Sequence, residues 1–90
     1  MTAKTQRKGI PMRILYILTA GTADPTKASL PVHLAVNGSA EVGDDPAIFI
    51  AGDGTEYLSG SAIDDAQGLG IPSMADLFAK IRQHEIPVYV

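Results

Sequence analysis

Residues 13–21 read RILYILTAG, and this stretch decides the class of fold. Five apolar residues, Ile14 to Leu18, follow one another without a polar residue between them. A strand with one solvent-exposed face would instead alternate apolar and polar residues. Such a run, closed by a glycine, is typical of a parallel strand that is buried on both faces. We therefore expect residues 14–18 to form a parallel strand covered by helices on both sides.

The segment that follows, GTADPTKASLPVHLAVNGSA (21–40), predicts a helix running toward Ala40. Either Thr22 or Asp24 can cap its first turn, because each carries a side-chain oxygen that can accept from a free backbone N–H. Pro25 suits a first-turn position, where its missing N–H costs nothing.

A second proline, Pro31, lies inside this helical run. Proline there removes one backbone hydrogen bond and clashes with the preceding turn. Two outcomes follow from the sequence: a helix that bends near Lys27, or a helix that begins only near Ser29.

The next segment, DDPAIFIAGDG (44–54), predicts a second apolar strand over residues 47–51, closed by a Gly-Asp-Gly turn. Residues 55–72 show no sustained period, and their three glycines with Pro72 predict a loop that holds at most a brief helical turn.

The last helix is predicted to begin after Ser73, with Asp76 at the capping-box spacing. Its apolar stripe consists of Met74, Leu77, Phe78 and Ile81. IPVYV (86–90) is the third strand. The order β-α-β-α-β predicts a three-layer parallel α/β sheet with right-handed crossovers, apparently truncated after the third strand. Because its edges are open, we expect a homo-oligomer.

Composition places these elements in one small domain, residues 13–90, after a flexible basic tail at residues 1–12. Ninety residues with 46% hydrophobic and 19% charged side chains are typical of a globular chain with a thin core. From Ile14 onward, three basic and ten acidic residues give a charge of −7, which argues against nucleic-acid binding. No apolar run approaches the roughly 20 residues of a membrane span, so we expect a cytoplasmic protein.

Ligands of such sheets bind beyond the carboxyl ends of the strands. The candidate ligand-binding residues there are Gly21, Thr22, Asp24, Gly52 and Asp53. The loop at Gly21 and Thr22 precedes a helix and can hold an anion, although it lacks a phosphate-loop motif, and a turn-and-cap role explains it as well. Asp53 can accept a ligand's hydrogen bond, but Gly-Asp-Gly also suits a tight turn, and the turn is favoured.

No catalytic residue, metal site or cofactor is predicted. The chain has no cysteine, which excludes thiolate ligands and cysteine nucleophiles from these ninety residues. His33 within a helix fits a packing or interface position. His84 lies near a helix end, where it can bond terminal carbonyls. Two histidines so far apart do not supply the three or four ligands of a metal centre.

Three stretches together resemble the DsrE/DsrF-like family of small sulfur-relay proteins, which includes YchN-like and TusD-like members. They are ILYILTAGTADPTKASLPVHLA (14–35), FIAGDGTEYL (49–58) and GIPSMADLFAKIRQHEIPVYV (70–90). The resemblance implies a flavodoxin-like fold, a trimer or hexamer, and a sulfur-relay partner protein. In many members a loop after the third strand carries a persulfide on a cysteine. This sequence has no cysteine, so no catalytic residue carries over.

Two functions follow as hypotheses. The chain is a sulfur-relay protein that lacks the reactive cysteine in the sequence given, or it is a non-catalytic oligomeric module that binds a small anionic ligand. Under either hypothesis, we expect that the chain as given is not an enzyme, because it has no cysteine nucleophile.

Overall fold

The computed structural model describes residues 11–90, so most of the predicted tail at residues 1–12 lies outside the described residues. The elements in chain order are β1 (Arg13–Leu18), α1 (Pro25–Leu34), the π-helical η1 (Ala35–Ser39), β2 (Asp45–Ile50), the 3-10 helix η2 (Gly52–Leu58), α2 (Ala62–Asp65), α3 (Met74–His84) and β3 (Val88–Tyr89). The expected α/β class and the presence of three strands are confirmed, although the third strand spans only Val88–Tyr89 of the predicted residues 86–90.

The three strands form one parallel sheet in the order β1-β2-β3. Leu15 pairs with Ala47, and Phe49 lies between Ile17 of β1 and Tyr89 of β3. The second strand begins at Asp45, two residues before its predicted start, and it tolerates the proline at position 46. That proline's nitrogen points toward β3, which pairs with β2 only from Ile48 onward, so no bond of the sheet is lost.

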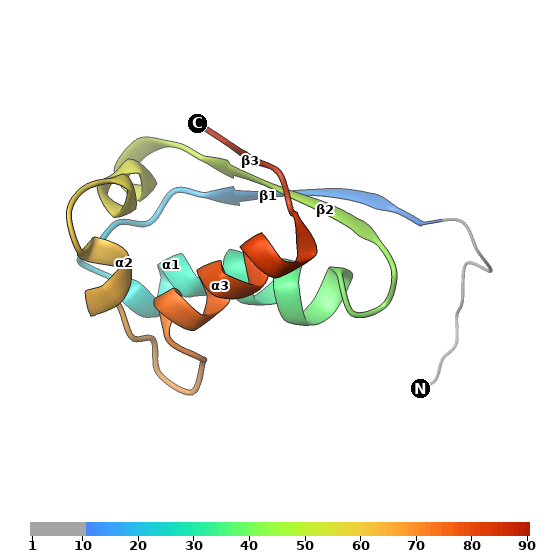
Figure 1. Cartoon of the computed structure of the whole chain (residues 1–90). Coiled ribbons are helices and arrows are strands. Elements are labelled where there is room, and N and C mark those ends of the chain that lie inside the picture. Colours follow the sequence, from blue (N-terminus) through green and yellow to red (C-terminus); the bar gives the residue numbers. More distant parts are fainter. Residues whose placement is uncertain (1–10) are drawn as a thin grey trace.

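Helices α1 and α3 both lie on the same face of the sheet (Figure 1). The strand order explains why, because each right-handed crossover moves one strand further in the same direction and so places its helix on the same side. The predicted three-layer arrangement is therefore wrong for the described residues, which form two layers. A third layer requires a crossover in the opposite direction, past β1.

The core lies between this helix-covered face and the helices. Its largest fully buried side chains come from β1, β2, η2, α1 and α3: Leu18, Ile48, Ile50, Tyr57, Val32, Met74 and Leu77. Polar Ser29 is also fully buried, and its hydroxyl donates to the carbonyl oxygen of Pro25 at 2.7 Å. The buried polar group is thus paired, as burial requires.

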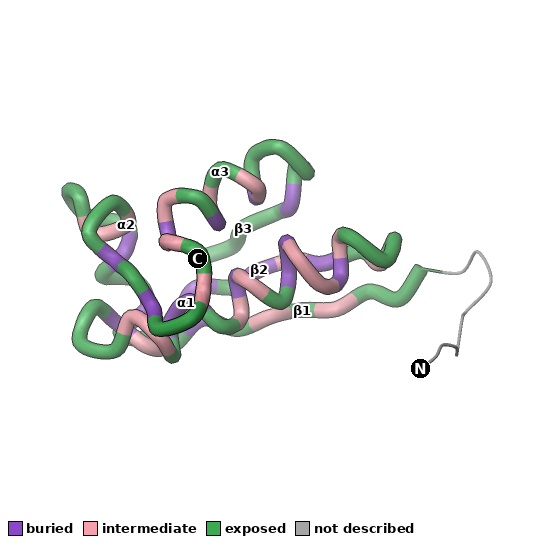
Figure 2. The backbone as a smooth tube through the Cα atoms, turned by 90° about the horizontal axis from the view of Figure 1, so that it is seen from below, coloured by how far each residue is buried: buried purple, intermediate pink, exposed green. Residues whose placement is uncertain are grey.

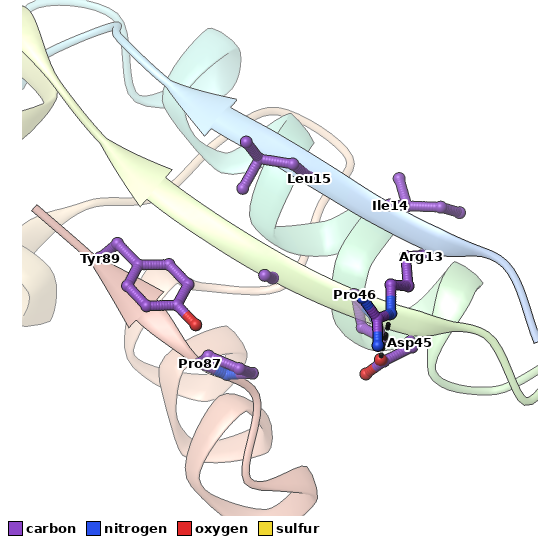
Figure 3. A pocket seen from close by; sticks show the side chains of 8 residues that line it. Arg13, Ile14, Leu15, Asp45, Pro46, Pro87 and Tyr89 are labelled. Carbon is purple, nitrogen blue, oxygen red and sulfur yellow. Dashed lines mark ion pairs between the residues drawn. The ribbon is translucent and has the colours of Figure 1, made fainter.

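The opposite face of the sheet is not covered by any described residue, and the expectation of strands buried on both faces is wrong. Leu15, Ile17 and Tyr89 are 56%, 54% and 57% exposed on this face. Figure 2 shows β1 as exposed or partly buried along most of its length. Figure 3 shows Leu15 and Tyr89 standing on this side of the sheet with the helices behind, above a shallow hollow of about 300 Å³. We call this surface the open face.

Helix α1 begins at Pro25 and continues through Pro31, so the alternative start near Ser29 is wrong. Asp24 is the cap: its Oδ1 accepts from the backbone N–H of Lys27 at 3.0 Å. Beyond Leu34 the helix widens into the π-helical η1, where the Ala40 N–H donates to the carbonyl of Ala35.

The second half of the chain follows its predicted pattern more closely. Ser73 caps α3 by accepting from the N–H of Asp76 at 3.2 Å, and Met74, Leu77 and Ile81 are buried as expected. The predicted loop at residues 55–72 is more helical than expected, because it contains most of η2 and all of α2. Within residues 11–90, no helix is long and apolar enough to cross a membrane.

Candidate functional site

The loops at the carboxyl ends of β1 and β2 are joined by a buried tyrosine. Tyr57 in η2 is 1% exposed, and its hydroxyl donates to the carbonyl oxygen of Gly21 at 2.9 Å. Burial is the main cause that raises the pKa of Tyr57 above its ordinary value, with smaller contributions from the negative charges of Glu56 and Asp24. Tyr57 is therefore a neutral hydrogen-bond donor that fixes the first loop against the second.

The neighbouring Glu56 holds the same loop from outside. Its Oε1 accepts from the backbone N–H of Thr22 at 2.8 Å and from the Thr22 hydroxyl at 3.0 Å. These two bonds, the backbone bond first, lower the pKa of Glu56 below its ordinary range. Gly21 allows this approach, since a Cβ there would overlap Glu56 Oε1 and lie 2.9 Å from the carbonyl oxygen of Asp53. Glycine at position 21 is thus needed for the close approach of Glu56 and of the Asp53 carbonyl to this loop.

The predicted ligand-binding residues come to the same edge of the sheet, where Gly21, Thr22 and Asp24 form hydrogen bonds within the protein itself. The Thr22 N–H, predicted as an anion donor, already donates to the Glu56 carboxylate. Asp24 caps α1. Asp53 is exposed in the first turn of η2, and Gly52 before it has a φ of +55°, which favours glycine. An anion at this loop must therefore displace Glu56.

Sequence reasoning missed Glu56 and Tyr57 because they lie in a segment without periodicity. The signal available was a single large aromatic residue three positions after the Gly-Asp-Gly turn. Gly54 of that turn was also missed as a packing position: a Cβ there would overlap the carbonyl oxygen of Leu18. The turn itself forms, with the Gly54 N–H donating to Ala51 at 3.0 Å.

A cavity of about 330 Å³ lies beside this loop, between the start of α1 and α2. It is lined by Thr22, Pro25, Ala62, Asp65 and Ala66. Three of these residues present apolar atoms, while the threonine and the aspartate supply polar groups. The aspartate's Oδ2 accepts from the hydroxyl of the serine that precedes α2, at 3.1 Å. Only Thr22 of the predicted ligand-binding residues lines this cavity.

The two histidines contact polar side chains of neighbouring segments. Nδ1 of His33 lies 3.0 Å from the side-chain nitrogen of Asn37, whose oxygen accepts from Lys80 on α3. His84 Nε2 lies 3.9 Å from a carboxylate oxygen of Glu41. Within residues 11–90, no three histidine, aspartate or glutamate side chains group in a way that could hold a metal ion.

Comparison with protein-family models, with curated proteins and with solved structures found no match to this chain. The class that the described residues define is a small α/β protein with a three-stranded parallel sheet.

Proposed function

We propose that this chain is a non-catalytic binding module that holds a small molecule in the cavity between Thr22 and Asp65. The observation that carries the proposal is the position of this cavity, of about 330 Å³, beside the loop at the carboxyl end of β1. Parallel α/β sheets bind their ligands at this edge. The volume lies within the range of small-molecule sites, roughly 300 to 1,000 Å³, and the lining combines apolar walls with two polar groups, as such sites do.

The charges near the cavity favour a ligand that donates hydrogen bonds or carries positive charge. Asp65 lines the cavity, Asp24 lies on the adjoining loop, and Glu56 of η2 accepts hydrogen bonds from that loop. A carboxylate accepts hydrogen bonds and repels anions. We therefore propose a small ligand with an ammonium or hydroxyl group and an apolar body, in place of the anion expected from the sequence.

The polar groups at this edge favour binding over catalysis. The Tyr57 hydroxyl is buried and donates to Gly21, and Glu56 has a lowered pKa because it accepts from Thr22. A general base works best with a pKa near the operating pH. Neither group meets that condition.

The test is a thermal-shift and calorimetric series with butylammonium, butanol and butyrate. Binding of the ammonium compound at one hundred times its dissociation constant stabilises the protein by about 2.7 kcal/mol. Asp65→Asn should abolish this shift, while Asp64→Asn, on the same helix but outside the cavity lining, should retain it. A larger shift with butyrate, or equal shifts in the two variants, would contradict the proposal.

Sulfur relay of the DsrE/DsrF-like type, in the cytoplasm and with a partner protein, is the second candidate. The observation that favours it is β3 lying parallel to β2, so that its carboxyl end opens at the same edge as Thr22. The family resemblance assigns the reactive cysteine to the loop after this strand. Because these ninety residues contain no cysteine, the proposed role is that of a carrier scaffold whose thiol is supplied from elsewhere.

A cysteine placed at the end of β3 tests this candidate. Val90→Cys should gain one sulfur atom from a persulfide donor faster than the control variant Leu69→Cys. Leu69 is 85% exposed and lies in the loop before α3. The gain is measured by intact mass against time. Equal rates at the two positions would show that this edge has no special reactivity toward sulfur, and would end the sulfur-relay proposal.

A further inference from the structure

The outer edge of β1 carries backbone groups that no described strand pairs. The carbonyl of Leu18 accepts from the Ala51 N–H at 3.0 Å, and that of Met12 accepts from Asp45 at 2.9 Å, so even-numbered residues bond toward β2. Odd-numbered residues therefore direct their N–H and C=O groups away from β2. Because β1 is the first strand in the sheet order, the groups of Leu15 and Ile17 face an empty side among the described residues.

Apolar side chains flank this edge above and below. A groove of about 490 Å³ runs between β1 and α1, lined on the strand side by Leu15 and Ile17 and on the helix side by Leu30 and Leu34. These four side chains are between 44% and 56% exposed. Unpaired backbone donors and acceptors between two apolar walls are the features of a site that accepts an added strand.

The other edge of the sheet does not offer the same surface. There β3 contributes only two paired residues, Val88 and Tyr89, whereas β1 contributes six. Very short edge strands are a common protection against further pairing. Strand addition is therefore favoured at β1.

We propose that β1 pairs antiparallel with β1 of a second copy of this chain across a twofold axis, giving a continuous six-stranded sheet. Side chains directly opposite each other in an antiparallel pair share a face, so a residue must oppose one of the same parity. A register centred on Tyr16 places Leu15 opposite Ile17 of the second copy and Ile14 opposite Leu18. The strand is thus self-complementary, with apolar residues facing apolar residues.

The distribution of charge permits a second copy at this edge. All ten acidic residues of the chain lie at Asp24 or later, and neither β1 nor α1 contains one. The charged residue that lines the groove is Lys27 on the helix, while Arg13, at one end of the strand, lies 4.0 Å from the Asp45 carboxylate of its own chain. In the register centred on Tyr16, Arg13 opposes Thr19 rather than another cation. Two chains of net charge −3 can therefore meet here without bringing carboxylates together.

The same axis places α1 beside α1 of the second copy. Leu30 and Leu34, half exposed in one chain, then pack against their symmetry mates and lose contact with water. Such an isologous contact uses one patch on both chains and closes at two copies. This inference does not depend on the proposed ligand, since the cavity beside Asp65 is at the carboxyl end of the sheet.

Analytical ultracentrifugation of the full chain tests the dimer, which is expected at twice 9.4 kDa. Leu15→Pro removes an N–H that points outward and spares the bonds to β2, so the monomer still folds. This variant should raise the dissociation constant at least about thirtyfold. Leu34→Glu should also give a monomer, whereas Leu58→Glu, at an exposed leucine of matched accessibility (51% against 50%), should remain dimeric.

Hydrogen exchange supplies a second measurement. The N–H groups of Leu15 and Ile17 should exchange more slowly as protein concentration rises, and Leu34→Glu should remove this dependence. A monomeric wild type at 100 μM would overturn the proposal. A dimer that survives Leu15→Pro and Leu34→Glu but separates with Phe49→Lys would overturn it too, because the open face would then be the interface.

Discussion

Replacing Tyr57 by phenylalanine removes one buried hydroxyl and leaves the packing of the ring in place. The hydroxyl donates at 2.9 Å to the carbonyl of Gly21, and both residues are buried. The Asp24 N–H also donates to that carbonyl, at 3.2 Å, so the substitution removes one of its two donors, and the loss of one such hydrogen bond costs about 0.5 to 1.5 kcal/mol. Taking roughly 1 kcal/mol, the Tm of a domain of this size should fall by about 4 to 8 °C.

The assay is thermal and urea denaturation followed by circular dichroism, with Tyr89→Phe as the control. Tyr89 is 57% exposed, so removal of its hydroxyl should change stability by less than about 0.5 kcal/mol. If Tyr57→Phe were as stable as the control, the bond to Gly21 would contribute nothing, and the account of how the two loops are joined would be refuted.

The raised pKa of Tyr57 adds an alkaline test of the same contact. In the unfolded chain the phenol ionises near its ordinary value of 10.0, while in the folded chain it keeps its proton to higher pH. Above pH 10 the unfolded state therefore binds fewer protons, and stability falls as pH rises. Tyr57→Phe should lose this part of the alkaline slope in urea midpoints measured from pH 8 to 11.

Three further predictions concern neighbouring contacts. Because the pKa of Glu56 is lower in the folded than in the unfolded protein, the ionised carboxylate stabilises the fold above pH 4.5, the ordinary pKa of the group. This stabilisation is lost as pH falls through the pKa of Glu56 in the folded protein. Glu56→Gln should therefore flatten the acid limb of a stability profile between about pH 6 and 3. Gly54→Ala forces a Cβ onto the Leu18 carbonyl and should lower the urea midpoint, whereas Gly38→Ala, with nothing within 4 Å, should not; equal midpoints would contradict the packing. Ser73→Ala removes a helix cap and should cost about 1 kcal/mol by the same assay; no loss would mean that the bond to the Asp76 N–H is replaced by water.

The helices and strands could be predicted from local sequence where one physical signal dominates. Ser73 and Asp76 mark the start of α3 because capping is set within one turn. The apolar runs mark all three strands. Pro31 misled the prediction in part, because a proline penalty is local and the packing of Val32 and Ala28 in the core outweighs it.

The site was harder to predict because it depends on contacts between distant segments. The bonds from Thr22 to Glu56 join residues thirty-four positions apart, and no period in residues 55–72 indicates them. Gly21, Thr22, Gly52 and Asp53 could be placed at one edge from topology alone. The hydrogen-bond partners of their backbone groups could not be predicted, because these partners depend on how η2 folds back over the first loop.

The open face and the free edge of β1 have one common cause. Because the strands succeed one another in a single direction, every right-handed crossover within residues 11–90 leaves the same face bare, and no described strand lies outside β1. A twofold axis normal to the sheet fills the edge but keeps the helices of both copies on one side. Leu15, Ile17, Phe49 and Tyr89 of the two chains then form one larger apolar face. Phe49 and Tyr89 lie on this face but take no part in the pairing at β1, so Phe49→Lys should leave the dimer intact and remove only species larger than it.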